Sequence, residues 1–152
     1  GTCSSIATIP ANLNAAEILH IPPHIRNIVI PLGAPIHKDG SSMSSIIKLA
    51  LLFAMFGKDF SAPSLFLAIM GITIIVSVVE GGIPNGGYIG EVFAITVFGF
   101  PMEQALPVAM VIGTLVDPIA TLLNANGDLV SAMMVTRLAE GRDWLKKALS
   151  AP

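Results

Sequence analysis

Residues 60–79 read FSAPSLFLAIMGITIIVSVV and contain no charged side chain. A helix needs about 20 mostly apolar residues to cross the hydrocarbon core of a bilayer. Ser61 is a suitable N-cap, and Pro63 suits a first helical turn, where its missing N–H costs little. This stretch therefore predicts a membrane-embedded helix.

The chain must turn immediately after this helix, because residues 80–87 read EGGIPNGG. Glycine admits positive φ, and proline removes a backbone donor. The next apolar run, residues 88–100, contains Glu91 and is short for a membrane span. Two apolar arms around a Gly/Pro tip predict a re-entrant helical hairpin over residues 60–100. An αα-hairpin in a soluble core is the alternative.

The composition of the whole chain points the same way. Its 152 residues are 53% hydrophobic and 12% charged, with a formal net charge of -2. An ordinary soluble domain carries about 25% charged residues, so this composition argues against a freely soluble monomer. No Lys/Arg cluster is large enough to neutralise phosphates, which argues against nucleic acid as a partner.

The sequence also argues against an enzyme. It contains no GxSxG, HExxH or P-loop pattern. Asp117 and Asp128 would lie about 16 Å apart on an unbroken helix, too far for the paired carboxylates of a hydrolase. We therefore expect neither catalysis nor an organic cofactor.

Polar residues interrupt the last apolar segment, residues 101–139. It contains Asp117-Pro118 and the run Asn124-Ala-Asn-Gly-Asp128. An ionised residue at the bilayer centre costs about 2.5 to 3.5 kcal/mol on insertion scales, so these residues need compensation. Pro118 and the Asn-Gly pair predict a broken helix. Its free carbonyls, beside Asn124 and Asp128, would form an oxygen-rich pocket suited to a hard cation such as Na⁺.

The first third of the chain repeats this arrangement. Residues 1–10 form a small, hydroxyl-rich tip, and residues 28–56 form an apolar helix broken at His37-Lys-Asp-Gly-Ser41. Discontinuous helices in corresponding positions of two halves indicate the midplane site of a secondary transporter. We thus predict an all-α membrane protein with re-entrant helical hairpins and two discontinuous transmembrane helices.

This order of motifs resembles that of the dicarboxylate/amino acid:cation symporters, the glutamate transporter family. Residues 31–41 (PLGAPIHKDGS) resemble PLGATINMDGT in the family's broken seventh helix, and residues 82–87 (GIPNGG) resemble its GVPGAG hairpin tip. The serine-rich residues 3–10 resemble its first hairpin tip, and residues 117–128 resemble its eighth helix.

The resemblance implies a C-terminal transport-domain fragment over residues 1–152. Its expected parts are the tip and second-arm start of the first hairpin (1–10), a broken helix (28–56), the second re-entrant hairpin (60–100), a broken last helix (101–139) and a cytoplasmic tail (140–152). Basic residues beside the membrane exit agree with a cytoplasmic C-terminus, with Trp144 at the headgroups.

The family implies a secondary active transporter, a homotrimer that spans the cell (inner) membrane several times. Its transport domain would slide like an elevator through the lipid bilayer, carrying a small amino acid or carboxylate with Na⁺ or H⁺. The alternative is a non-transporting structural fragment that oligomerises to bury its apolar faces.

The resemblance also implies roles for individual residues. Asn124 would hold the main carboxylate of the substrate, Asp117 would receive an amino group, and residues 82–87 would form a movable gate. The expected substrate-binding residues are Ser4, Ser5, Ser41, Gly82, Ile83, Pro84, Gly87, Asp117, Ala120 and Asn124. The expected Na⁺ residues are Gly33, His37, Asp39, Asn124 and Asp128.

The sequence departs from the family pattern at three positions. Ala120 stands where acidic amino acid carriers have an arginine, so no guanidinium is present to pair with a side-chain carboxylate. A neutral amino acid is therefore favoured over an acidic one. His37 replaces an Asn, and Lys38 replaces a Met at a family sodium site.

The ammonium of Lys38 could act as a tethered cation, in which case at least one Na⁺ is lost or replaced. The alternative is an interfacial charge. We expect Lys48, inside an apolar run, to extend along its helix to the interface.

Overall fold

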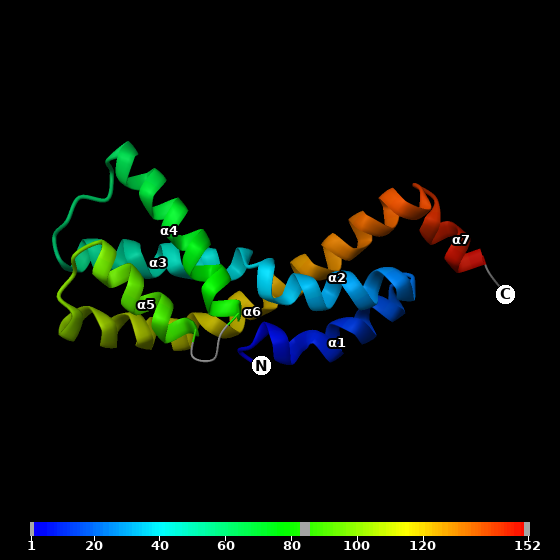
Figure 1. Ribbon diagram of the computed structural model, residues 1–152, viewed down its shortest axis with the longest axis horizontal. Coiled ribbons are helices and arrows are strands. Elements are labelled where there is room, and N and C mark those ends of the chain that lie inside the picture. Colours follow the sequence, from blue (N-terminus) through cyan, green and yellow to red (C-terminus); the bar gives the residue numbers. More distant parts are fainter. Residues whose placement is uncertain (1, 83–85, 151–152) are drawn as a thin grey trace.

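The computed structural model describes residues 2–82 and 86–150, and their regular structure is helical (Figure 1). The helices are α1 (Ser5–Ile18), α2 (Pro23–Ile36), α3 (Asp39–Met55), α4 (Pro63–Gly82), α5 (Gly86–Val97), α6 (Met102–Glu140) and α7 (Trp144–Ser150).

Two of these helices are long and apolar enough to cross a membrane. They are Pro63–Gly81 and Met102–Glu140, each of which contains an apolar window of 18 residues, with mean hydropathies of 2.1 and 1.9. Only 28% and 22% of these two windows are buried inside the molecule, whereas the core helix of a soluble protein is mostly buried. Their apolar surfaces are therefore available to lipid, and the predicted all-α membrane protein is confirmed.

The long helix α6 connects two separate apolar cores (Figure 1). The first core joins α3, α4, α5 and the first third of α6, and it contains Leu52, Ile69, Ile95 and Ala105. The second joins α1, α2, α7 and the last third of α6, and it contains Ala16, Ile30, Ala132 and Trp144. Between these cores lies the middle of α6, near which α1, α3 and α5 begin and α2 and α4 end.

The predicted break in the first long helix is confirmed. Helix α2 ends at Ile36 and α3 begins at Asp39. The C-cap His37 is extended, with φ -83 and ψ 98, and its N–H donates to the carbonyl of Gly33 at 2.7 Å. Two boundaries differ from the predicted ones. Helix α2 already begins at Pro23, since proline suits a first helical turn, and the tip over residues 1–10 continues as a helix to Ile18.

The predicted break in the last long helix is wrong, because α6 continues from Met102 to Glu140 with Pro107 and Pro118 inside it. Figure 1 shows the helix changing direction along its length without interruption. The Asn-Gly pair that suggested the break is Asn126-Gly127. A Cβ at Gly127 would collide with the ring of His37, so this glycine lets the α2–α3 break pack against an unbroken helix. Nearby, the Asn124 side-chain oxygen accepts the N–H of Gly40 in α3 at 2.9 Å.

Helices α4 and α5 are the two arms expected of the second hairpin. They pack closely where Gly90 faces Val76, since a Cβ at Gly90 would lie 2.7 Å from the Val76 side chain. Ser61 does not cap α4 as expected. Its N–H and hydroxyl both donate to Asp59, at 2.8 and 2.6 Å, and these bonds lower the pKa of that exposed carboxyl. The predicted gate residues Ile83 and Pro84 lie outside the described residues.

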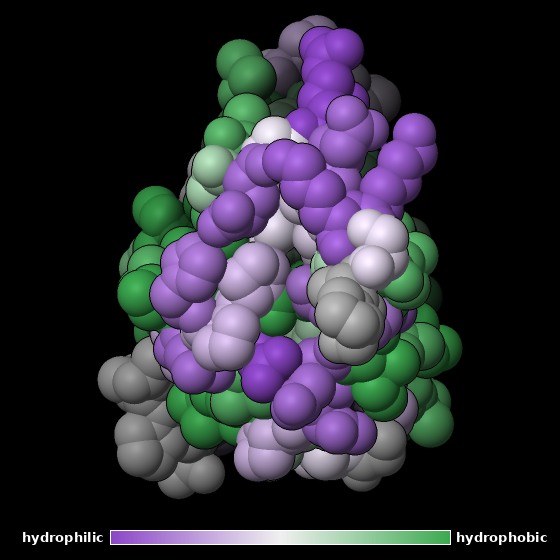
Figure 2. Space-filling view, turned by 90° about the vertical axis from the view of Figure 1, so that its right-hand side faces the viewer, coloured by the Kyte–Doolittle hydropathy of each residue, from purple (hydrophilic) through white to green (hydrophobic). Residues whose placement is uncertain are grey.

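Polar side chains gather at the end of the molecule that carries α7, where Figure 2 shows a hydrophilic face bordered by apolar flanks. Ion pairs across this end join His24 to Glu140 and Arg26 to Glu17, each at 3.2 Å. Trp144 was expected at the lipid headgroups, but it is only 8% exposed and packs in the second core. An amphipathic tail helix presents the same sequence pattern whether its aromatic residue faces lipid or protein.

Candidate binding cavity

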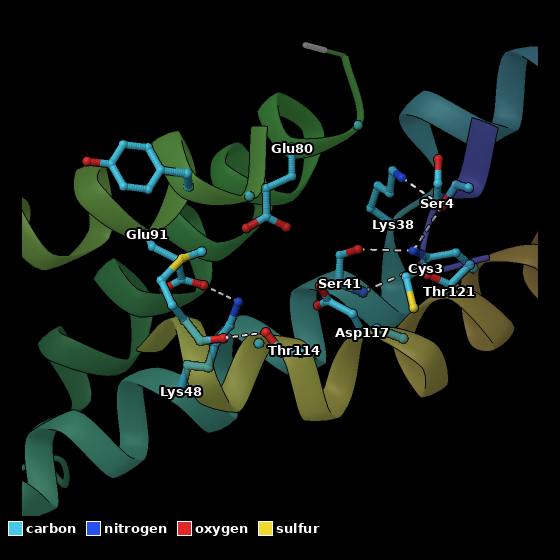
Figure 3. Close-up of a pocket in the computed structure, with 18 of the residues that line it drawn as sticks. Cys3, Ser4, Lys38, Ser41, Lys48, Glu80, Glu91, Thr114, Asp117 and Thr121 are labelled. Atoms are coloured by element: carbon cyan, nitrogen blue, oxygen red, sulfur yellow. Dashed lines mark hydrogen bonds and ion pairs between the residues drawn. The ribbon is translucent and has the colours of Figure 1, made fainter. Parts of the chain in front are cut away.

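A cavity of about 570 Å³ lies between the two cores. The N-terminus of α1, the break between α2 and α3, the end of α4, the start of α5 and the middle of α6 all border it (Figure 3). Its polar lining residues are Cys3, Ser4, Ser5, Lys38, Ser41, Lys48, Glu80, Tyr88, Glu91, Thr114, Asp117, Thr121 and Asn124. The cavity thus unites side chains that lie far apart in the sequence.

Helix α6 presents one face to this cavity. Asp117, Ala120, Thr121 and Asn124 line it, at the spacing of three and four residues that places helical side chains on one side. The unbroken helix therefore brings together the three α6 residues predicted from the sequence to bind substrate.

Asn124 connects three helices beneath the cavity and is only 1% exposed. Its oxygen accepts the N–H of Gly40, and its amide nitrogen donates to Ser41 Oγ at 3.0 Å and Ser5 Oγ at 3.4 Å. Asn124 therefore already has partners in this structure. A bound carboxylate would share or replace the two hydroxyl contacts, while the bond to the backbone of α3 could persist.

Lys38 lies at the edge of the cavity beside the α1 tip. Its Nζ donates to Ser5 Oγ at 2.8 Å, and Figure 3 shows the side chain directed from the α2–α3 break toward Ser4. Ser4 is the N-cap of α1 and accepts the N–H of Ala7 at 3.3 Å. The break and the serine-rich tip are thus joined by a charged hydrogen bond.

A buried ion pair between Lys48 of α3 and Glu91 of α5 borders the cavity. The two side chains are 5% and 8% exposed. Lys48 therefore does not extend to an interface, and that prediction is wrong. A buried pair compensates both charges only if the partners meet in good geometry, so it fixes the position of α5 against α3.

The remaining predicted ion residues gather at the α2–α3 break, next to the cavity. Asp128 is 1% exposed, and its Oδ1 lies 3.8 Å from Nδ1 of His37. Asp39, whose side chain is 52% exposed, lies 3.9 Å from the same nitrogen. Neither Asp128 Oδ1 nor His37 Nδ1 has a hydrogen-bond partner among the described residues. A buried carboxylate oxygen without a donor suits a cation.

The backbone approaches this carboxylate closely at Gly33, where a Cβ would collide with Asp128 Oδ1 and lie 3.0 Å from Cγ. The Gly33 backbone can therefore approach Asp128 only because it has no side chain. In the described part of the chain, no group of three His, Cys, Asp or Glu side chains could hold a metal ion. Backbone carbonyls would have to supply further ligands for a hard cation.

Comparison with known proteins decides the family. The model of the sodium:dicarboxylate symporter family matches residues 1–138. The chain belongs to this family. The match covers every helix that borders the cavity, including α6 up to its last turn.

Three symporter relatives illustrate the similarity. A Caenorhabditis elegans protein (glt-4), whose name includes the words sodium-dependent excitatory amino acid transporter, is 27% identical over 96% of this chain and 29% of its own length. Human neutral amino acid transporter A is 25% identical over 90% of this chain and 26% of its own length. The serine/threonine transporter SstT of Bifidobacterium adolescentis is 27% identical over 99% of this chain and 35% of its own length.

The chain therefore spans about a third or less of the length of these relatives. No solved structure matches it.

In this member of the family, the structure brings to one cavity the predicted residues Ser4, Ser5, Ser41, Gly87, Asp117, Ala120 and Asn124. Gly82 ends α4. Of the cation candidates, Asn124 lines the cavity, whereas Gly33, His37, Asp39 and Asp128 lie beside it. The sequence argument missed Lys48, Glu80 and Glu91 as cavity residues. A signal was present, since isolated charges of opposite sign in apolar helices require partners. Nothing in the sequence identified which charge meets which.

Proposed function

We propose that this chain is the solute- and ion-binding part of a secondary active transporter. The transporter would couple Na⁺ or H⁺ to the symport of a small amino acid or carboxylate. One observation carries the proposal: Ser5, Ser41 and Asn124, from three different helices, meet at a cavity along a membrane-spanning helix. The sodium in the family's name and the transporter names of its relatives support it.

We propose a neutral amino acid as the favoured solute. The hydroxyls of Ser5 and Ser41 and the Asn124 amide supply neutral donors for a carboxylate, and Asp117 supplies an acceptor for an ammonium group. Ala120, three residues from Asp117 on the same helix face, leaves no guanidinium there for a second carboxylate. Two of the three relatives are named for neutral amino acids or for serine and threonine, which agrees with this choice.

We propose that a Na⁺ carried with the solute binds at Asp128. The buried Oδ1 without a donor and the close approach of Gly33 support this position. Carbonyls of Gly33, His37 and Asn124 would complete the ligand set, and Asp39 would serve a further ion. Because Asp128 is one helical turn from Asn124, an ion there would also influence the residue that contacts the solute.

The proposed setting is the cell (inner) membrane, with the transport domain moving as an elevator in a homotrimer. Large side chains such as Leu115, Ile119 and Leu122 on α6 are 60 to 72% exposed, which supports contact with lipid or with further protein. The basic residues Arg137 to Lys147 at the polar end support a cytoplasmic C-terminus.

Uptake by the full-length protein in liposomes tests this proposal. Labelled neutral amino acids, acidic amino acids and dicarboxylates would each be offered with and without a Na⁺ or H⁺ gradient. We expect gradient-driven uptake of a neutral amino acid, with Na⁺ coupling weakened in Asp128→Asn. Asp143→Asn is the matched control, since Asp143 is 69% exposed in the tail. Absence of gradient-driven uptake across the panel would contradict the proposal.

A further inference from the structure

We propose that the ammonium group of Lys38 is a built-in cation, which occupies a position that would otherwise bind a mobile Na⁺. This inference rests on the proposed function and concerns the number of ions carried. Its basis is the set of groups that surround Lys38 Nζ in the structure.

Three chain segments meet at this ammonium group. Nζ donates to Ser5 Oγ at 2.8 Å in the first turn of α1. Gly81, in the last turn of α4, packs directly against the lysine side chain, since a Cβ there would lie 3.2 Å from Nζ. The same Cβ would lie 2.7 Å from the carbonyl oxygen of Pro35 in the last turn of α2.

Two helices therefore end next to the lysine. The last four carbonyls of a helix have no partner within it, and the helix dipole places about half a negative charge at that end. The ends of α2 and α4 both present this negative potential near Lys38. The side chains of Asp128 and Glu80 are near enough to Nζ to interact with it electrostatically. Carbonyl ends of interrupted helices are the groups that hold Na⁺ in secondary transporters.

Lys38 forms no salt bridge within the described residues. Among the ion pairs of the described residues, Lys48 joins Glu91, but no carboxylate lies within 4.0 Å of Lys38 Nζ. Glu80 Oε1 likewise has no hydrogen-bond partner among the described residues, and Figure 3 shows this side chain extending into the cavity from the end of α4. Lys38 therefore supplies a cation's charge to its surroundings without forming a structural pair.

An ammonium group that is part of the chain reduces the number of ions that must bind. A mobile ion must be captured before α1, α2 and α4 can be held together, whereas Lys38 is already present. It also excludes Na⁺ from this position, because two cations cannot share one set of oxygens. The protein should thus need fewer Na⁺ ions than one with a neutral residue at position 38.

The test uses full-length protein in detergent and measures thermal stability as a function of NaCl, with choline chloride keeping ionic strength constant. A ligand that binds the folded state stabilises it by mass action. We expect Lys38→Met to lose stability without Na⁺ and to gain a Na⁺-dependent stabilisation that the parent lacks. The Na⁺ dependence of uptake should become steeper by one ion. Lys38→Arg should behave as the parent, and so should Lys146→Met, whose side chain is 87% exposed.

Each outcome decides the inference. A Lys38→Met protein that gains no Na⁺-dependent stabilisation beyond that of the parent would overturn it, and so would a Lys38→Met protein that no Na⁺ concentration stabilises. That result would leave the proposed function intact if the parent still accumulates solute. If the parent protein shows no gradient-driven uptake of any solute in the panel, the proposed function is refuted instead.

Discussion

The side-chain oxygen of Asn124 accepts the backbone N–H of Gly40 at 2.9 Å, a bond between residues 84 positions apart. The N–H groups in the first turn of a helix have no partner within it. Asn124 of α6 thus helps to satisfy the start of α3, while its amide nitrogen reaches Ser41 and Ser5. One carboxamide fixes the relative positions of α1, α3 and α6 at the cavity.

Replacement of Asn124 by alanine should therefore affect both stability and binding. We expect Asn124→Ala to lower the free energy of unfolding by about 1–3 kcal/mol, because buried polar partners lose their hydrogen bonds. Stabilisation by bound solute should fall further. Thermal unfolding with and without solute measures both effects. Asn126→Ala on the exposed face of α6 is the control. Equal stability of the two variants would contradict this role.

Gly40 should not tolerate a side chain. A Cβ at this position would lie 2.9 Å from the Cα and carbonyl carbon of Ala120, which are backbone atoms and cannot rotate away. We expect Gly40→Ala to cost about 1–3 kcal/mol by forcing α3 from α6.

Gly71→Ala on α4 is the matched control, since a Cβ there meets no atom within 4 Å. It should be neutral or stabilising by up to about 1 kcal/mol, because alanine is the better helix former. Similar melting temperatures for the two variants would show that α3 and α6 do not pack as described.

The Lys48 and Glu91 pair should show strong coupling in a double-mutant cycle. Lys48→Met leaves a buried carboxylate without a partner, which costs about 3–5 kcal/mol, and Glu91→Leu leaves a buried ammonium. The double variant Lys48→Met/Glu91→Leu should recover most of the stability, because it buries no unpaired charge. Chemical or thermal unfolding of the four proteins supplies the cycle. Additive losses in the double variant would argue against the pair.

Much of the helical arrangement follows from local sequence signals. The membrane helix over residues 60–79 was predicted closely, because it is α4 (Pro63–Gly82) and its apolar run has no competing structure. The break at residues 37–41 was also predicted, since the polar HKDGS motif interrupts an apolar stretch. Each signal is one continuous stretch of sequence, where propensity and hydropathy are informative.

The errors concern residues whose partners lie elsewhere in the chain. Pro118 and the Asn126-Gly127 pair suggested a break, but α6 continues through them, and Gly127 instead makes room for His37. Lys48 suggested an interfacial charge, but Glu91, 43 residues away, neutralises it. Trp144 suggested a headgroup contact, but the second core encloses it. A single sequence shows that a polar or charged side chain in an apolar helix needs a partner, but it does not show which residue that partner is.

The residue at position 120 should determine whether neutral or acidic solutes are preferred, because this chain has no arginine there. Ala120→Arg would place a guanidinium at the cavity, three residues from Asp117. A charged hydrogen bond contributes about 1.5–3 kcal/mol, so acidic amino acids should gain about tenfold or more in competition against neutral ones. Competition assays in liposomes measure the ratio. Ala120→Gln, which is polar without a charge, should leave it nearly unchanged, and an equal shift in both variants would exclude a charge effect.

The uninterrupted course of α6 has a mechanical consequence. One continuous helix contains Asp117, Asn124 and Asp128, so the spacing between them follows from the helical rise per residue and does not depend on loop conformation. A solute and an ion held by these residues would therefore move together. Release of one without the other would require a neighbouring segment to move away first. The shorter helices that pack around α6 would then determine when the solute and the ion are released.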